Sequence, residues 1–185
     1  MAHTHVTEIK SEKLVVSNKL KGIIFSFLLI GALTLVIGFF TNKDRTWQAF
    51  LLSFFFFTSI ALGGLFFTAI QYVTNAGWSA TVRRIAESLS TFLPVAAIGA
   101  VLIVGLGAPY LFEWVHPDVV SADELLHKKE AYLNMPAWAI RTAIFFGLWF
   151  LFSKIIVGNS LKQDVTGAEN LTTKNVRNSI LFILF

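Results

Sequence analysis

Residues 22–40 read GIIFSFLLIGALTLVIGFF, an apolar run that contains no charged side chain. The hydrocarbon core of a bilayer is about 30 Å thick, and about 20 helical residues are needed to cross it. Lys19 and Lys21 precede the run, and Lys43 and Arg45 follow it, so charge marks both of its ends. The run therefore predicts a transmembrane helix.

Further runs of this kind follow along the chain. The predicted spans are residues 22–40, 49–72, 85–112, 136–157 and an incomplete fifth, 176–185. We therefore expect an all-α fold, a polytopic transmembrane helix bundle over residues 22–185, preceded by a cytoplasmic amino-terminal segment over residues 1–21.

Two features modify this simple pattern of spans. Pro94 removes a backbone donor inside the third span and crowds the carbonyl of Ser90, so we expect a kink between these two residues. The fifth run ends in SILFILF and is too short to cross a bilayer, so we interpret the chain as the front part of a longer protein.

Composition excludes several classes of protein. The chain is 55% hydrophobic and only 14% charged, whereas soluble proteins carry about 25% charged residues. A soluble enzyme, a disordered tail and a nucleic-acid binder are therefore disfavoured. Because the chain has no Cys, it has no thiolate for an iron–sulfur cluster and no attachment point for c-type haem.

The distribution of positive charge predicts the orientation of the chain. Ten of the fifteen Lys and Arg residues fall on the side of the amino terminus, which the positive-inside rule places in the cytoplasm. These ten are Lys10, Lys13, Lys19, Lys21, Arg83, Arg84, Lys154, Lys162, Lys174 and Arg177.

The loop over residues 113–135 is then external. In it, Ser121 to Glu124 match a capping box and predict a short surface helix that begins after Ser121. Trp114 and Trp138 stand where an outer aromatic belt would lie.

Few side chains suit metal or haem binding. The four histidines are His3 and His5 in the amino-terminal segment and His116 and His127 in the external loop, so the spans offer no imidazole to a haem. His116 and His127 match no metal motif by their spacing, and we expect no metal site. For Phe54 to Phe57, lipid contact and helix packing are favoured over the alternative of a box that binds a ligand ring.

A polar group lies at the predicted cytoplasmic ends of spans two and three. It includes Gln71, Arg83, Arg84 and Glu87. Such a group can relay protons or meet a polar headgroup. The simpler interpretation, which we favour, is an interfacial ion pair between Arg84 and Glu87, one helical turn apart.

Arg141 stands about a turn and a half inside the fourth span, where a cation is costly unless it is paired. Glu113, Tyr110 and His116 are candidate partners at the outer end of span three, and a quinone headgroup would fit between such donors and the nearby aromatic rings. The alternative is an arginine whose head reaches the outer headgroups, and this alternative is favoured.

Two long stretches carry a resemblance to a known family. They are TWQAFLLSFFFFTSIALGGLFFTAIQYVTNAGWSATVRRIAESLSTFLP (46–94) and KKEAYLNMPAWAIRTAIFFGLWFL (128–151). Over about residues 46–151 the chain resembles the second NrfD-like membrane subunit of alternative complex III, a quinol:cytochrome c oxidoreductase of bacteria. The resemblance rests on the overall pattern of residues in these stretches, and it assigns no catalytic residue.

The resemblance implies a subunit of the bacterial cytoplasmic membrane that lies beside a sister NrfD-like subunit, haem c subunits and an iron–sulfur subunit. It implies interaction with a quinone, either menaquinone or ubiquinone, and no covalent cofactor or metal on this chain. Its role would be quinone interaction, proton movement or structural support. The alternative is a subunit of a secondary transporter or ion channel, which should show interrupted helices or a paired repeat.

Overall fold

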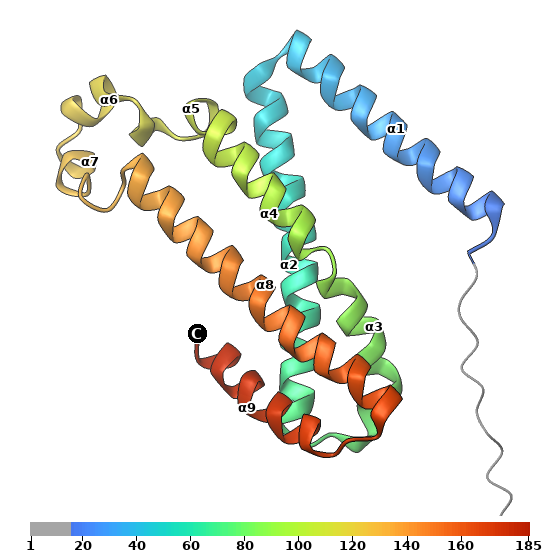
Figure 1. The fold of residues 1–185 in the computed structure, drawn as a ribbon. Coiled ribbons are helices and arrows are strands. Elements are labelled where there is room, and N and C mark those ends of the chain that lie inside the picture. The colour runs from blue at the N-terminus through green and yellow to red at the C-terminus, as the bar shows by residue number, and fades with distance from the viewer. Residues whose placement is uncertain (1–15) are drawn as a thin grey trace, which may run out of the picture. The chain divides into compact units, whose positions relative to one another are not determined.

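The computed structural model describes residues 16–185, without the side chains of Ala80 and Thr81, and all regular structure in this range is helical (Figure 1). The predicted amino-terminal segment lies mostly in residues 1–15, outside the described residues, together with His3 and His5. The elements in chain order are α1 (Asn18–Thr41), α2 (Lys43–Val73), η1 (Gly77–Ser79), α3 (Ala80–Ser90), α4 (Leu93–Leu102), η2 (Ile103–Gly107), α5 (Ala108–Leu111), η3 (Glu113–Val115), α6 (Pro117–Ala122), α7 (Glu124–Lys128), α8 (Met135–Thr166) and α9 (Asn170–Leu184).

Four stretches of helix are long and apolar enough to cross a membrane: α1, α2, the series α3 to α5 over Val82–Leu111, and α8. They correspond to the four complete predicted spans, so the all-helical, multi-span architecture is confirmed. The helices extend beyond the apolar runs, because hydropathy marks only the lipid-facing length while backbone hydrogen bonding continues into polar sequence. In α8 it continues to Thr166, where Gly167 ends the helix with a left-handed backbone (φ 64°).

The chain divides into two compact units, Met1–Asn42 and Lys43–Phe185. The described part of the first unit is essentially α1, a 24-residue helix with no buried residue among its members. The Ser17 side chain caps it by accepting a hydrogen bond from the Leu20 amide at 3.3 Å. A helix that is apolar on all sides and exposed is suited to contact with lipid or with another apolar protein surface.

The second unit contains the interrupted third span. Helix α3 ends at Ser90 and α4 begins at Leu93, with Pro94 in its first turn, so the predicted kink is confirmed. The Ser90 hydroxyl donates to the Glu87 carbonyl at 2.8 Å, and the Thr91 hydroxyl donates to the Ser88 carbonyl at 2.6 Å. These hydroxyls add to the backbone hydrogen bonds at the break, where the Thr91 amide also donates to the Ser88 carbonyl at 3.2 Å.

A π-helical turn, η2, follows α4, and the sequence did not predict it. It precedes Pro109, which has no N–H to donate to the preceding turn. A π-turn inside an α-helix is uncommon and is frequently found at a functional site.

Helices α2, α3, α8 and α9 pack together at the end of the unit where α3 follows α2 and α9 follows α8 (Figure 1). A Cβ atom at Gly64 would lie 2.6 Å from the Ala86 carbonyl, so α2 and α3 approach too closely for a side chain. The apolar core of this unit comes from α2, α4, α8 and α9 and consists of Ala61, Leu65, Ala69, Tyr72, Leu93, Ile156 and Phe182.

The loop over residues 113–135 contains the predicted surface helix, but the helix begins at a different residue. Asp123 is the N-cap of α7, and its Oδ1 accepts a hydrogen bond from the Leu125 amide at 2.8 Å. Ser121, the predicted cap, lies in α6, and its hydroxyl donates to the Asp118 carbonyl at 2.9 Å. The prediction of the cap was wrong because α6, which begins at Pro117, already uses the Ser121 hydroxyl.

Candidate functional site

Glu87 is the most deeply buried charged side chain that the structure describes, with 2% of its surface exposed. Its Oε2 accepts a hydrogen bond from Arg84 Nη1 at 2.5 Å, and Arg83 Nε lies 3.6 Å from its Oε1. The Ser160 hydroxyl of α8 donates to the same Oε1 at 2.7 Å. The carboxylate therefore has partners from its own helix and from α8, as a buried charge requires.

Arg84 extends the contact between α3 and α8. It pairs with Asp164 through Nη2 and donates to the Ser160 carbonyl at 3.2 Å. The Arg84–Glu87 pair predicted from their spacing is confirmed. Ser160 and Asp164 were missed because 73 and 80 residues separate them from their partners. We call Arg83, Arg84, Glu87, Ser160 and Asp164 the charged clasp; it holds two positive and two negative groups.

Outside the charged clasp, uncharged hydrogen bonds join α3 to α8 and α8 to α9. The Ser153 hydroxyl donates to Ser90 Oγ at 3.1 Å, next to the break between α3 and α4. In the hairpin of α8 and α9, Asn159 Nδ2 donates to Asn175 Oδ1 at 2.9 Å, and Asn175 Nδ2 donates to the Ile156 carbonyl at 3.0 Å. In lipid such bonds hold helices together, because water is not present to replace them.

Gln71, a candidate from the sequence, lies near the end of α2 and is buried. Among the described residues, its Oε1 and the neighbouring Tyr72 hydroxyl have no hydrogen-bond partner. The Tyr72 ring lies under the Arg83 guanidinium, 4.5 Å from centroid to Cζ. Tyr72 therefore contacts the charged clasp through its ring, and Gln71 makes no hydrogen bond to it.

Arg141 has its partner in the loop over residues 113–135. Its Nη2 donates to the Tyr132 carbonyl at 2.9 Å, and its guanidinium lies 3.9 Å from the centre of the Tyr132 ring. These contacts tie the end of the loop to the first turns of α8. They give Arg141 a partner that the sequence did not single out.

The other two candidates lie on the loop side of the same region. His116 Nε2 forms a hydrogen bond with the Pro109 carbonyl at 2.9 Å, and the Glu113 carbonyl accepts one from the His116 amide at 3.0 Å. Arg141, Glu113 and His116 are thus near the start of α8, whereas Gln71 and Glu87 are near its far end. The five candidate residues do not form one site.

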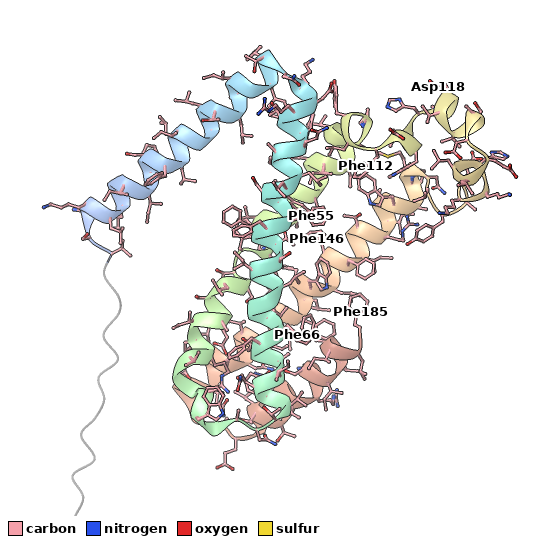
Figure 2. The ribbon with its side chains drawn as sticks, turned by 180° about the vertical axis from the view of Figure 1, so that it is seen from behind. Phe55, Phe66, Phe112, Asp118, Phe146 and Phe185 are labelled. Carbon is pink, nitrogen blue, oxygen red and sulfur yellow. The ribbon has the colours of Figure 1, made fainter. Side chains whose placement is uncertain are left out.

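An apolar cleft between α2, α4, η2 and α8 provides a site that the sequence did not predict. One part, which we call the aromatic compartment, has a volume of about 480 Å³ and is lined by the rings of Phe54, Phe55, Phe112, Trp138, Phe145, Phe146 and Trp149. Figure 2 shows Phe112 where α5 leads into the loop and Phe146 farther along α8. Of the phenylalanine run, Phe56 and Phe57 are exposed and do not line this cavity.

A second part, the aliphatic groove, adjoins the first and has a volume of about 560 Å³. Small side chains from α4, η2 and α8 dominate its lining, such as Ala97, Gly105, Ala143 and Gly147. The two parts share four residues, Ala100, Val104, Thr142 and Phe146. No charged residue lines either part.

The aromatic compartment meets the loop over residues 113–135 through a cluster of three rings. The Phe112 and Trp138 rings, both in its lining, lie 5.1 Å apart, and the Trp114 ring lies 5.5 Å from Phe112 and 5.3 Å from Trp138. Trp114 and Trp138, predicted as members of an aromatic belt, therefore pack against each other.

Within the described residues, no group of three or more His, Asp or Glu side chains is arranged to hold a metal ion. No protein-family model matches the chain, and no curated protein matches it significantly in sequence.

Proposed function

We propose that this chain is an integral membrane subunit of a bacterial respiratory quinol:cytochrome c oxidoreductase of the alternative complex III type. It would lie in the cytoplasmic membrane with its amino terminus in the cytoplasm, beside a sister NrfD-like subunit. The resemblance over residues 46–151 suggests the family, and four helices of spanning length are consistent with it.

The observation that carries the proposal is the uncharged cleft between α2, α4, η2 and α8. Sites for small molecules are mostly apolar, have volumes of about 300–1,000 Å³ and contain a few polar groups that orient the ligand. The cleft meets each of these conditions, and the π-turn η2 lies in its wall. A neutral, ring-containing molecule that is dissolved in the bilayer, such as menaquinone or ubiquinone, is the ligand class that fits.

The chain's side chains would bind and orient this molecule and exclude water from it. A bound quinol supplies electrons and protons. The electrons would pass to partner subunits that hold c-type haem and an iron–sulfur cluster, because this chain contains no Cys and places no His in its predicted spans. The charged clasp would provide structural support by fixing α3 against α8.

One observation favours a second candidate, a subunit of a secondary transporter or ion channel. The third span is broken between Ser90 and Leu93, and Glu87 is buried one turn before the break. Broken helices and buried ionisable side chains are typical of transport pathways.

Purification of the full protein from native membranes in mild detergent, through an affinity tag on this chain, separates the two candidates. We expect c-type haem absorbance, iron–sulfur signals and quinol:cytochrome c reductase activity to co-purify with the tagged chain. A stoichiometric preparation without haem and without this activity would contradict the proposed function and favour the transporter.

A further inference from the structure

The two parts of the cleft differ in chemistry in a way that distinguishes the two ends of a ligand. Flat aromatic rings line the aromatic compartment, and they suit a flat ring of the ligand. Small aliphatic residues dominate the aliphatic groove, which leaves an apolar space of about 560 Å³ for a hydrocarbon chain. Thr142 and Phe146 line both parts, so one ligand can occupy the two together.

Three side chains that carry hydrogen-bond donors and share one face of α8 line the aromatic compartment. Trp138, Thr142 and Trp149 stand at relative positions i, i+4 and i+11, which lie on one face of a helix, and all three line the compartment. Among the described residues, none accepts a hydrogen bond from the Thr142 hydroxyl or from either indole N–H. Thr142 lies seven residues into α8, about 10 Å along its axis, where the bilayer offers no water to replace the missing partner.

These donors call for a ligand with acceptor oxygens, and the uncharged lining excludes a phospholipid headgroup, whose phosphate would be buried without a counter-charge. Trp138 and Thr142 are four residues apart, about 6 Å along the helix, a spacing similar to that of two carbonyl oxygens at opposite ends of a six-membered ring. A neutral ring with two carbonyl oxygens would match the aromatic rings and the donors, and a long hydrocarbon tail would match the aliphatic groove.

We propose that the cleft binds a prenylated quinone with its ring in the aromatic compartment, one carbonyl oxygen accepting a hydrogen bond from Thr142, and its isoprenoid tail in the aliphatic groove. This inference rests on the proposed function and assigns each part of the ligand to a part of the cleft.

Two substitutions separate the ring from the tail. A Cβ atom at Gly147 meets no atom within 4 Å, so Gly147→Leu fills the aliphatic groove without disturbing α8. Thr142→Val removes the hydroxyl and keeps the shape. The matched control is Gly63→Leu on the exposed side of α2, where a Cβ atom also meets nothing within 4 Å and which lies outside the cleft lining.

The test uses the full protein in native membranes, labelled by light with two azidobenzoquinones, one with a long isoprenoid tail and one with methyl groups only. Labelled residues are mapped by mass spectrometry. We expect both probes to label residues 51–55 or 138–149. Gly147→Leu should weaken labelling by the tailed probe about tenfold or more and leave labelling by the tailless probe unchanged. Thr142→Val should weaken labelling by both probes about two- to tenfold. Gly63→Leu should match the wild type.

The outcomes separate this inference from the proposed function. Labelling of the wild type outside the cleft, or equal effects of Gly147→Leu on both probes, would overturn the assignment of ring and tail while leaving the subunit's place in the complex intact. Absence of specific labelling of this chain by either probe would overturn quinone binding in the cleft altogether. The haem and iron–sulfur co-purification described above tests the proposed function independently of both results.

Discussion

Replacement of Glu87 by leucine would remove the carboxylate that Arg83, Arg84 and Ser160 share. In the native protein this carboxylate is 2% exposed and is bound by Arg84 at 2.5 Å and by Ser160 at 2.7 Å. The leucine offers neither charge nor acceptor, so two cations and a buried hydroxyl lose their common partner.

The expected decrease in the free energy of unfolding follows from these contacts. Removal of one partner from a buried ion pair typically costs about 3–5 kcal/mol. We reduce this to about 2–4 kcal/mol, because the Arg84 side chain is 32% exposed and retains Asp164 and the Ser160 carbonyl. Glu87→Gln keeps an oxygen for Ser160 but loses the charge and the oxygen that accepts from Arg84, so about 1–2 kcal/mol is expected. Asp164→Asn should cost about 1 kcal/mol or less, since the Asp164 side chain is 58% exposed.

Thermal unfolding of the detergent-solubilised full protein measures this order, because a larger loss of unfolding free energy lowers the melting temperature further. The melting temperature should fall most for Glu87→Leu, less for Glu87→Gln and least for Asp164→Asn. An Asp164→Asn protein that melts as low as Glu87→Leu would refute the argument from burial. A Glu87→Leu protein that melts at the wild-type temperature would show that α8 is held to α3 without the charged clasp.

Two further predictions concern the loop and the topology. Arg141→Leu should destabilise the loop locally by about 1–2 kcal/mol, seen as faster amide hydrogen exchange in residues 129–134, because it removes a charged hydrogen bond and a ring contact. Tyr132→Phe keeps the carbonyl and the ring and should exchange as the wild type; unchanged exchange in Arg141→Leu would reject this role. For the topology, a cysteine at exposed Ser121 should react with an impermeant thiol reagent added to intact cells, and one at exposed Gly77 should react only after permeabilisation. The reverse pattern would invert the predicted orientation.

The sequence by itself determined the membrane-spanning helices, the kink before Pro94 and the pairing of Arg84 with Glu87. Each depends on residues that are close along the chain. An apolar run of sufficient length must form hydrogen bonds within itself when lipid surrounds it, and a helix is how one segment does so. A proline acts on its own preceding turn, and two residues three positions apart lie on one helix face.

The tertiary structure alone decided which helix faces meet. Because α2 and α8 are apolar nearly all round, their sequences do not distinguish a face that packs on protein from one that meets lipid. Ser160 therefore gave no sign that it would reach Glu87, and Thr142 gave none that it would line a cleft. The cap of α7 moved to Asp123 for a similar reason, since α6 had already taken the Ser121 hydroxyl. Hydrophobicity places a segment in the bilayer, whereas close packing and hydrogen-bond satisfaction between distant segments decide which of its side chains form a site.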